Sequence, residues 1–265
     1  MARLTRHVAL VFVLGAAFIL PVQAFNPGAH IYIAKKALAT DDPTVWYGSI
    51  APDLAWYSSD PGKLLAWSHT NLDLRTLTQS TIEEAFARGW AAHGEITGAD
   101  RMAHWEWDRA VEGYVVERAK LLTRLPEAVR LDIGHKAIEA AIDLLLKRQD
   151  PILGQRVAAA AAAAEAAQVS AFMARGFATQ GVGAPAVMLA KGTFDYTLVM
   201  YAGALNLPAP YDLQAVAQLG VYEAAAYGYV LTPEEARAVI EQAMDVCHDY
   251  MRVINEAVRQ VKENQ

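Results

Sequence analysis

The stretch Pro126–Lys147, PEAVRLDIGHKAIEAAIDLLLK, decides the fold class, because its apolar residues recur at the spacing of a long buried helix. Strand-like alternation is scarce in the rest of the chain, and seven further stretches have helical periodicity. The sequence therefore predicts an all-α protein, a compact multi-helix bundle. The other expected helices are His30–Leu38, Thr81–Thr97, Asp100–Leu122, Pro151–Arg175, Ala184–Leu205, Tyr211–Tyr229 and Pro233–Lys262.

Two boundaries in this pattern carry specific signals. Thr232-Pro233-Glu234-Glu235 is a good helix start, with a Thr cap, Pro at the first position and acids in the first turn. Residues 81–97 and 100–122 are predicted as two helices, or as one helix interrupted near Gly98. Residues 41–64 are rich in Pro and Gly, which favours loops there.

The first 24 residues have the pattern of a secretory signal peptide. A basic start, MARLTRH, precedes the apolar run VALVFVLGAAFIL and the small-residue end PVQA. The run is shorter than the roughly 20 residues of a membrane-spanning helix. We therefore expect export to the periplasm or the medium, cleavage after Ala24, and one all-α domain over residues 25–265. Within it, residues 25–147 would carry the metal-site helices and residues 148–265 the C-terminal helices.

The charge balance argues against some partners. The chain has 23 Lys and Arg against 29 Asp and Glu, and cleavage removes only Arg3 and Arg6, which leaves a net charge of −8. Binding of long nucleic acids rests on neutralising phosphates with Lys and Arg, so no stable nucleic-acid binding is expected. The single cysteine, Cys247, excludes an intramolecular disulfide.

Five of the seven histidines fall in one N-terminal stretch, interleaved with carboxylates. Histidine and carboxylate together are zinc-type ligands. On one continuous helix, His93, Asp100 and His104 share a stripe, and His135 and Glu139 share a face four residues apart. The candidate ligands that would bind through their side chains are His30, Asp53, His69, His93, Asp100, His104, His135 and Glu139.

Distance sets the number of metal ions. Eleven helical residues rise about 16 Å, so one ion with bonds near 2 Å cannot take both His93 and His104. The pattern asks for two or more ions, which suits hydrolysis of phosphate esters. Each motif alone has a plainer interpretation: His93 as a buried core histidine, His135 and Glu139 as an ordinary side-chain pair, and Asp53 as a turn residue. Only the joint arrangement favours a metal site.

These residues resemble the motifs of the zinc-dependent phospholipase C family, which shares its fold and metal site with fungal single-strand-specific nucleases. The resemblance covers about residues 25–147. It implies a compact helical bundle of the phospholipase C/nuclease type. The motifs are Phe25-Asn-Pro-Gly-Ala-His30, Gly48-Ser-Ile-Ala-Pro-Asp53, Trp67-Ser-His69, Gly89-Trp-Ala-Ala-His93, Asp100-Arg-Met-Ala-His104 and His135-Lys-Ala-Ile-Glu139.

The resemblance implies a site for two or three Zn²⁺ ions and the residues that bind each of them. The family's mature chain begins with a tryptophan whose amino group and carbonyl bind one zinc together with a nearby histidine. Here Phe25 and His30 occupy those positions. Asp53, His69 and His93 would bind a second ion, and a third would take the set His104, His135 and Glu139.

One family position departs from the pattern. The family places a bridging aspartate four residues after the histidine, where this chain has Thr97. Asp100 is the better substitute, with a helix break at Gly98 restoring the geometry, and Glu95 is the weaker one. The metal number depends on this residue.

The implied activity is hydrolysis of phosphoric esters by metal-activated water, with Asp53 as ligand and as the group that orients or deprotonates the water. A phospholipid, with transient membrane-surface contact, is the default substrate. A nuclease or nucleotidase on the same scaffold, and a non-catalytic envelope protein with a degraded metal site, stay open. Aromatic residues available to flank a cleft, or to pack in the core, are Trp56, Tyr57, Trp67, Trp90, Trp105 and Trp107.

Overall fold

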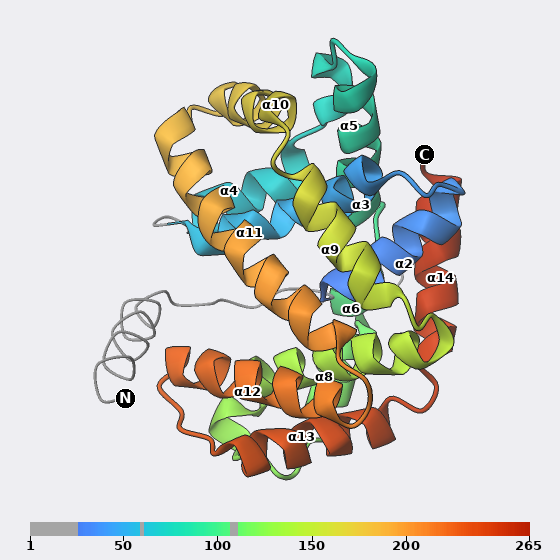
Figure 1. The fold of residues 1–265 in the computed structure, drawn as a ribbon, viewed down its shortest axis with the longest axis vertical. Coiled ribbons are helices and arrows are strands. Elements are labelled where there is room, and N and C mark those ends of the chain that lie inside the picture. Colours follow the sequence, from blue (N-terminus) through green and yellow to red (C-terminus); the bar gives the residue numbers. More distant parts are fainter. Residues whose placement is uncertain (1–25, 59–60, 107–110) are drawn as a thin grey trace, which may run out of the picture.

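The computed structural model describes residues 26–58, 61–106 and 111–265 (Figure 1). The expected signal peptide, Phe25 and Trp107 lie outside these residues. Helices make up 77% of the described chain and strands almost none of it, so the all-α prediction is confirmed. The described strands are the two-residue β1 (Trp105–Glu106) and β2 (Val111–Glu112), which pair antiparallel.

Helix α8 (Glu127–Gln149) is the predicted Pro126–Lys147 helix, and it is buried from Ile133 to Leu144 without an exposed position. At the bottom of Figure 1 it contacts α12 (Tyr211–Ala226) and α13 (Pro233–Val246). This part of α8 is therefore surrounded by protein on all sides and has no face in solvent. It also means that the polar residues of α8 face the interior.

Most of the other helices form a second group above α8 in Figure 1. Helix α2 contacts both groups, and α11 crosses between them while packing against α9. The bounds of these helices are α2 Pro27–Leu38, α3 Pro43–Ile50, α5 Thr81–His93, α9 Leu153–Ala163, α10 Ala167–Ala178, α11 Ala184–Asn206 and α14 Tyr250–Glu263.

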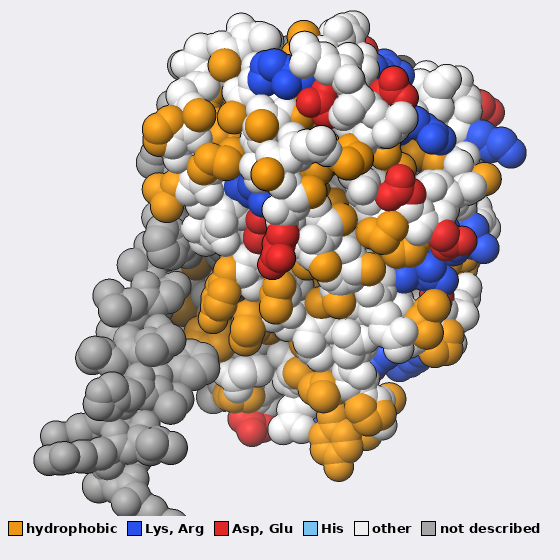
Figure 2. All heavy atoms as spheres, turned by 45° about the horizontal axis from the view of Figure 1, so that its top comes forward, with side chains coloured by type: hydrophobic (Ala, Val, Ile, Leu, Met, Phe, Trp, Pro, Cys, Tyr) orange, Lys and Arg blue, Asp and Glu red, His pale blue; other side chains and the backbone are white. Residues whose placement is uncertain are grey.

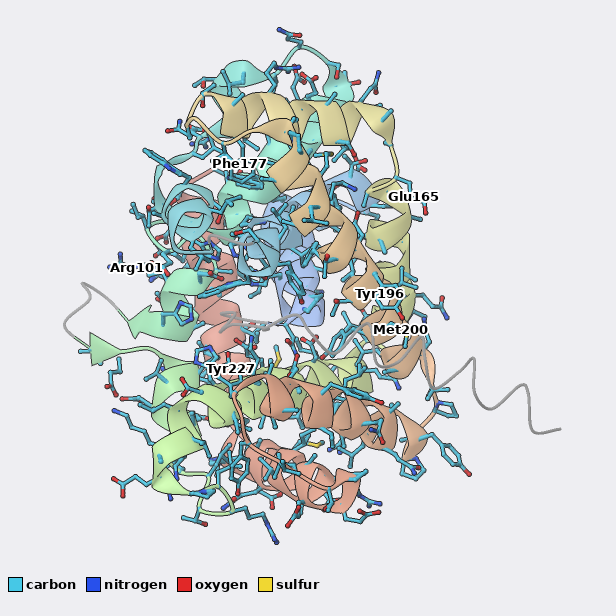
Figure 3. The ribbon with its side chains drawn as sticks, turned by 90° about the vertical axis from the view of Figure 1, so that its left-hand side faces the viewer. Arg101, Glu165, Phe177, Tyr196, Met200 and Tyr227 are labelled. Atoms are coloured by element: carbon cyan, nitrogen blue, oxygen red, sulfur yellow. The ribbon has the colours of Figure 1, made fainter. Side chains whose placement is uncertain are left out.

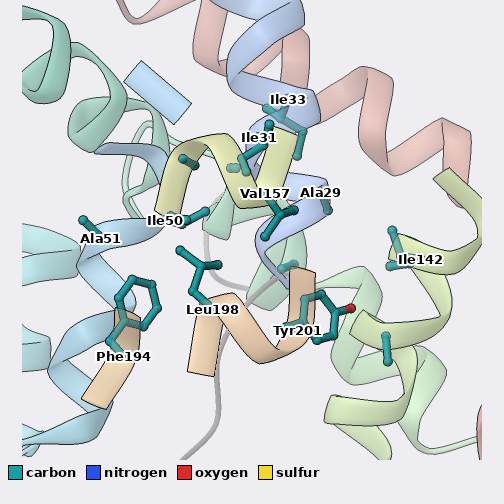
Figure 4. Close-up of a cluster of buried hydrophobic side chains, with 14 of the residues drawn as sticks. Ala29, Ile31, Ile33, Ile50, Ala51, Ile142, Val157, Phe194, Leu198 and Tyr201 are labelled. Carbon is teal, nitrogen blue, oxygen red and sulfur yellow. The ribbon is translucent and has the colours of Figure 1, made fainter. Parts of the chain in front are cut away.

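The core joins residues that are far apart in the sequence. Figure 4 shows side chains of α2, α8, α9 and α11 meeting in one apolar cluster. Ile31 of α2 and Val157 of α9 are both fully buried there, as is Ile142 of α8. Apolar burial of this kind is the main driving force that holds the two helix groups together.

The loop prediction for residues 41–64 is wrong. The segment folds into α3, the 3-10 helix η1 (Ala51–Tyr57) and the start of α4 (Pro61–Ala66). Its prolines start helices instead of breaking them, because the first helical position needs no N–H donor. Asp42 supports the first of these starts, since its side chain accepts the Thr44 N–H at 2.8 Å.

The predicted helix over Asp100–Leu122 is also wrong. The chain forms the short helix α6 (Asp100–His104), the strand pair, and then α7 (Tyr114–Ala119). Gly113 donates its N–H to the His104 carbonyl at 2.6 Å, and a Cβ there would meet the Ala103 carbonyl oxygen at 2.3 Å. A backbone approach this close requires glycine, and the helical periodicity of the stretch did not reveal it.

Two long predicted helices are each divided. The alanine-rich helix bends by 74° between α9 and α10, and the last predicted helix divides into α13 and α14 around residues 247–249. The predicted start of α13 is confirmed as a reciprocal cap. The Thr232 hydroxyl accepts the Glu235 N–H at 3.1 Å, and the Glu235 carboxylate accepts the Thr232 N–H at 2.8 Å.

Among the described helices, none alone has the length and apolar composition to cross a membrane. The bent pair α9 and α10 meets these two criteria when its members are taken together.

Helices α3 and α5 pack with their backbones in direct contact. A Cβ on Gly48 would lie 2.2 Å from the Phe86 carbonyl oxygen, and one on Gly89 would lie 2.0 Å from that of Val45. Both oxygens belong to backbone, which cannot move aside as a side chain could. The two glycines therefore set the spacing of α3 and α5.

We expect Gly89→Ala to destabilise the protein by about 1–3 kcal/mol, because the added methyl forces α3 and α5 apart. Gly192→Ala is the matched control. Gly192 is exposed on α11 with no atom within 4 Å of its Cβ position, so alanine should stabilise it by about 0.5–1 kcal/mol. Urea unfolding followed by circular dichroism measures both; equal stability of Gly89→Ala and wild type would contradict the prediction.

Candidate metal centre

Five predicted ligands come together from five separate elements, one of which is the π-helical turn η2 (Trp67–Asn71). All five side chains are buried, and none is more than 6% exposed. On the face drawn in Figure 2 no histidine reaches the surface. The five are His30 of α2, Asp53 of η1, His69 of η2, His93 of α5 and Asp100 of α6.

Asp100 lies at the middle of this group. Its Oδ1 is 3.2 Å from His30 Nε2, and its Oδ2 is 3.1 Å from His93 Nε2 and 3.5 Å from His69 Nε2. Asp53 Oδ1 lies 3.5 Å from His69 Nε2 and 3.7 Å from His93 Nε2. We refer to these five residues as the Asp100 cluster.

Within the Asp100 cluster, two sets of three ligand atoms lie within 4.8 Å of one another. One set is His30, Asp53 and His93, and the other is His69, His93 and Asp100. Both sets combine imidazole nitrogen with carboxylate oxygen in the interior. These buried groups could hold a metal ion, as the sequence predicted.

Hydrogen bonds orient two of the imidazoles. Nδ1–H of His93 donates to the Ser49 carbonyl at 2.8 Å, which leaves Nε2 to face the cluster. Nδ1 of His69 is hydrogen-bonded to Ser68 Oγ at 2.7 Å. Metal-binding histidines are usually held in this way by their second nitrogen. Ser49 follows Gly48, so the close contact of α3 and α5 also places the carbonyl that orients His93.

The carboxylates of the cluster face imidazoles. Both oxygens of Asp100 and Oδ1 of Asp53 are buried, and for the described residues the polar groups that approach them are the imidazoles of the cluster. Burial raises the pKa of Asp100, but His93 and His30 outweigh burial and hold this pKa well below its usual value. A buried, ionised carboxylate is costly unless cations compensate it, and a metal ion would do so.

A helix break, and not one continuous helix, brings Asp100 to His93. Helix α5 ends at His93, and a tight turn returns the chain, with Gly98 N–H donating to Gly94 O and Ala99 N–H to Ala92 O, both at 2.9 Å. A Cβ on Gly98 would lie 2.5 Å from the His93 carbonyl oxygen, so the turn requires glycine. The predicted break at Gly98 is confirmed, so the alternative of one continuous helix, on which His93, Asp100 and His104 would share a stripe, does not hold.

The break also separates the two candidates for the bridging aspartate. Asp100 enters the cluster, whereas Glu95 lies beside His104, with Oε1 3.6 Å from Nδ1. Thr97, at the position of the family's aspartate, is exposed. Of the two candidates, Asp100 is the one that lies among the histidines of the cluster.

The predicted third set is less compact. His135 Nε2 lies 2.9 Å from Glu139 Oε1, and the His104 and His135 rings are 5.3 Å apart. Over the described ranges, the ligand atoms of these three residues are not all within 4.8 Å of one another. Burial lowers the pKa of His135, which favours the neutral, ligating form. Burial also acts to lower the pKa of His104, but Glu95 and Asp100 raise it overall.

Asp143 is a site residue that the sequence interpretation missed. Its carboxyl accepts the N–H groups of Gly28 at 2.8 Å and Ala29 at 2.6 Å, and the Tyr201 hydroxyl at 3.1 Å. It therefore caps the first turn of α2, immediately before His30. The available signal was spacing, because Asp143 follows Glu139 by four residues on the same helix.

Access to the cluster is available at His69. A cavity of about 200 Å³ is lined by Ser68, His69 and Arg75. The Trp56 ring meets His69 edge-on at 6.4 Å, so Trp56 is placed at the cluster. Trp90 also lines this cavity, and its ring is otherwise buried, with the indole N–H donating to the Leu72 carbonyl at 3.1 Å.

No protein-family model, curated protein or solved structure matches this chain. The resemblance to the phospholipase C family therefore rests on the sequence motifs alone.

We expect zinc to bind wild-type protein and raise its melting temperature, because a ligand at 1,000 times its Kd stabilises the folded state by about 4 kcal/mol. Asp100→Asn should bind at least one ion fewer and lose most of this stabilisation. His248→Ala, which removes an exposed histidine outside the cluster, should behave as wild type. Elemental analysis and thermal melts measure both quantities, and unchanged zinc content in Asp100→Asn would refute the assignment.

Asp143 should make stability depend on pH. Burial raises the pKa of Asp143 to about 7, although Gly28, Tyr201 and Ala29 donate hydrogen bonds to it. Between about pH 4 and pH 7 the unfolded carboxyl has lost its proton while the folded one keeps it, so stability falls as pH rises. The difference in unfolding free energy between wild type and Asp143→Asn should shrink by about 2–4 kcal/mol from pH 4 to pH 8.

Urea unfolding of chelator-treated protein at both pH values measures this difference. Asp245→Asn, at an exposed position of α13, is the control and should show no such change. A difference that stays constant with pH would mean that Asp143 is ionised in both states.

Proposed function

We propose that this protein is an exported, zinc-dependent phosphoric-ester hydrolase of the phospholipase C type. The observation that carries the proposal is the Asp100 cluster, in which five buried ligands from five elements meet. Imidazole and carboxylate donors suit zinc, and the buried carboxylate oxygens suit a cation. Their order along the chain is the order of the family motifs.

The contacts favour a division of the ligands among ions. Asp53, His69 and His93 would hold one zinc, and His30 would hold another with the backbone of Phe25. Asp100 reaches both sides, since its two oxygens approach His30 and His93 separately. The buried start of α2, from Asn26 to His30, supports a processed N-terminus inside the protein. A third ion would require the ligand atoms of His104, His135 and Glu139 to move closer to one another.

Zinc, when bound, supplies an acidified water and stabilises negative charge on the phosphoryl oxygens. The protein's own groups do the rest. Asp53, which is buried with Oδ1 3.5 Å from His69 Nε2, would orient the attacking water and accept its proton. Ser49 and Ser68 hold His93 and His69 in position through their Nδ1 atoms. Burial of the cluster excludes bulk water and strengthens these electrostatic contacts.

The surface supports a lipid-type substrate over a polynucleotide. The expected mature charge of −8 opposes binding of long polyanions. Helix α11 exposes apolar side chains, including Tyr196 at 65% and Val199 at 57%, and Figure 3 labels Tyr196 and Met200 along this helix. Exposed apolar side chains of this kind favour transient contact with a membrane surface.

We expect Asp53→Asn to lower kcat for a phosphodiester by about 10²–10⁴-fold, the usual loss on removing a general base. Asp245→Asn is the control and should retain activity. Zinc-loaded protein that starts at Phe25 would be assayed on bis(p-nitrophenyl) phosphate, and circular dichroism would show that Asp53→Asn keeps its helical content. Full activity of Asp53→Asn would overturn the assigned role.

Natural substrates would then separate the family alternatives. Release of a phosphorylated headgroup from phosphatidylcholine supports the phospholipase C type, whereas cleavage of single-stranded DNA or RNA indicates a nuclease. Absence of hydrolysis in protein with two or three zinc ions would reject the enzyme proposal in favour of a binding role.

A further inference from the structure

The solvent-facing side of helix α11 carries no charge. From residue 184 to residue 211, which the structure describes without a gap, every exposed residue is uncharged. The two charged residues of the helix lie on its sheltered side, because Lys191 pairs with Asp195 at 2.5 Å and Asp195 accepts the Tyr47 hydroxyl of α3 at 2.8 Å. A surface helix usually turns its charges to solvent, so the opposite arrangement in α11 indicates a binding face.

The large apolar side chains of this face form one stripe. At about 100° per residue, Leu189, Tyr196, Met200 and Leu207 fall within about 40° of one another around the helix axis, and Val199 lies beside them. Figure 3 labels Tyr196 and Met200, which are one turn apart on α11. The exposed fractions are 64% for Leu189, 65% for Tyr196, 57% for Val199, 42% for Met200 and 40% for Leu207. We refer to these five residues as the α11 stripe.

The α11 stripe has matched spacing on the two sides of its centre. Leu189 and Leu207 each lie nine residues from Leu198, and Tyr196 and Met200 each lie two residues from it. A two-fold axis places residue i of one copy against residue j of the other, and j against i. With the axis level with Leu198, an antiparallel second copy would set leucine against leucine at both ends and methionine against tyrosine near the centre. A thioether packs favourably against an aromatic ring, so the α11 stripe is complementary to itself.

These features favour a protein helix over a lipid surface as the occupant. Helices that lie on membranes are rich in Lys and Arg beside their apolar face, and neither residue is exposed between residues 184 and 211. Contact with lipid also gives no reason for the matched spacing about Leu198.

The size of the α11 stripe predicts a weak, reversible contact. Its five side chains expose roughly 550 Å², so two copies would bury on the order of 1,000 Å², which is the lower limit for a specific interface. We therefore expect a dissociation constant in the micromolar range.

We propose that α11 is the interface of a homodimer, in which two copies of the α11 stripe pack antiparallel about a two-fold axis level with Leu198. The inference goes beyond the proposed hydrolysis and uses no metal ligand. The transient membrane contact proposed above needs the same face, so it is open to the monomer and not to the dimer.

Sedimentation equilibrium of zinc-loaded protein that starts at Phe25, from about 1 μM to about 100 μM, brackets the affinity expected of such an interface. Met200→Glu should raise the dissociation constant at least tenfold, because the interface would bury an unpaired charge. Leu121→Glu is the matched control, since it also replaces an exposed apolar residue but lies after α7, outside the α11 stripe. It should dimerise as wild type, and circular dichroism would show that both variants keep their helical content.

Cysteine cross-linking tests the antiparallel arrangement, because the native Cys247 is buried. Leu189→Cys and Leu207→Cys, mixed and treated with a short bis-maleimide, should give a covalent dimer that contains one copy of each. Neither variant should link to itself, since eighteen helical residues span about 27 Å.

Protein that stays monomeric over this range, equal dimerisation of wild type and Met200→Glu, or linking of Leu189→Cys to itself as readily as to Leu207→Cys would overturn the inference. Monomeric wild type that binds phosphatidylcholine vesicles, with Met200→Glu failing to bind, would also overturn it and assign the α11 stripe to a lipid surface. The readouts are mass and covalent linkage, so an inactive dimer would reject the hydrolase proposal alone, and an active monomer would reject the dimer alone.

Discussion

The cost of burying a carboxylate governs this structure. Asp100 is fully buried, and the imidazoles of His30, His69 and His93, which lie 3.1–3.5 Å from its oxygens, compensate its charge. An isolated buried carboxylate would be protonated or expelled. Each histidine comes from a different element, and the charge balance at Asp100 therefore ties α2, η2, α5 and α6 into one arrangement.

Two structural features position these candidate ligands. Gly48 and Gly89 let α3 and α5 approach closely enough for Ser49 to orient His93. Asp143 caps the first turn of α2 and so fixes the helix that carries His30. Ligands held in advance lose less conformational freedom when they bind an ion, which is why such supporting contacts matter as much as the ligands.

Two cavities differ in the polarity of their lining. The cavity at His69 is adjacent to the Asp100 cluster and contains polar groups, whereas a second cavity, which Lys136 lines from α8, is largely apolar. Glu139 connects the second cavity to the metal residues, because it contacts Lys136 on one oxygen and His135 on the other.

The sequence by itself determined the helical class, the long buried helix α8, the cap at Thr232 and which residue types could ligate a metal, because periodicity and caps act over a few residues. The tertiary structure decided the rest. The sequence predicted a break at Gly98, but a helical phase cannot reveal the turn that brings Asp100 within 3.1 Å of His93, nor that Asp143 contacts the start of α2. These contacts depend on close backbone approaches and on pairs more than 100 residues apart, as between Gly28 and Asp143, and local patterns do not encode such distances.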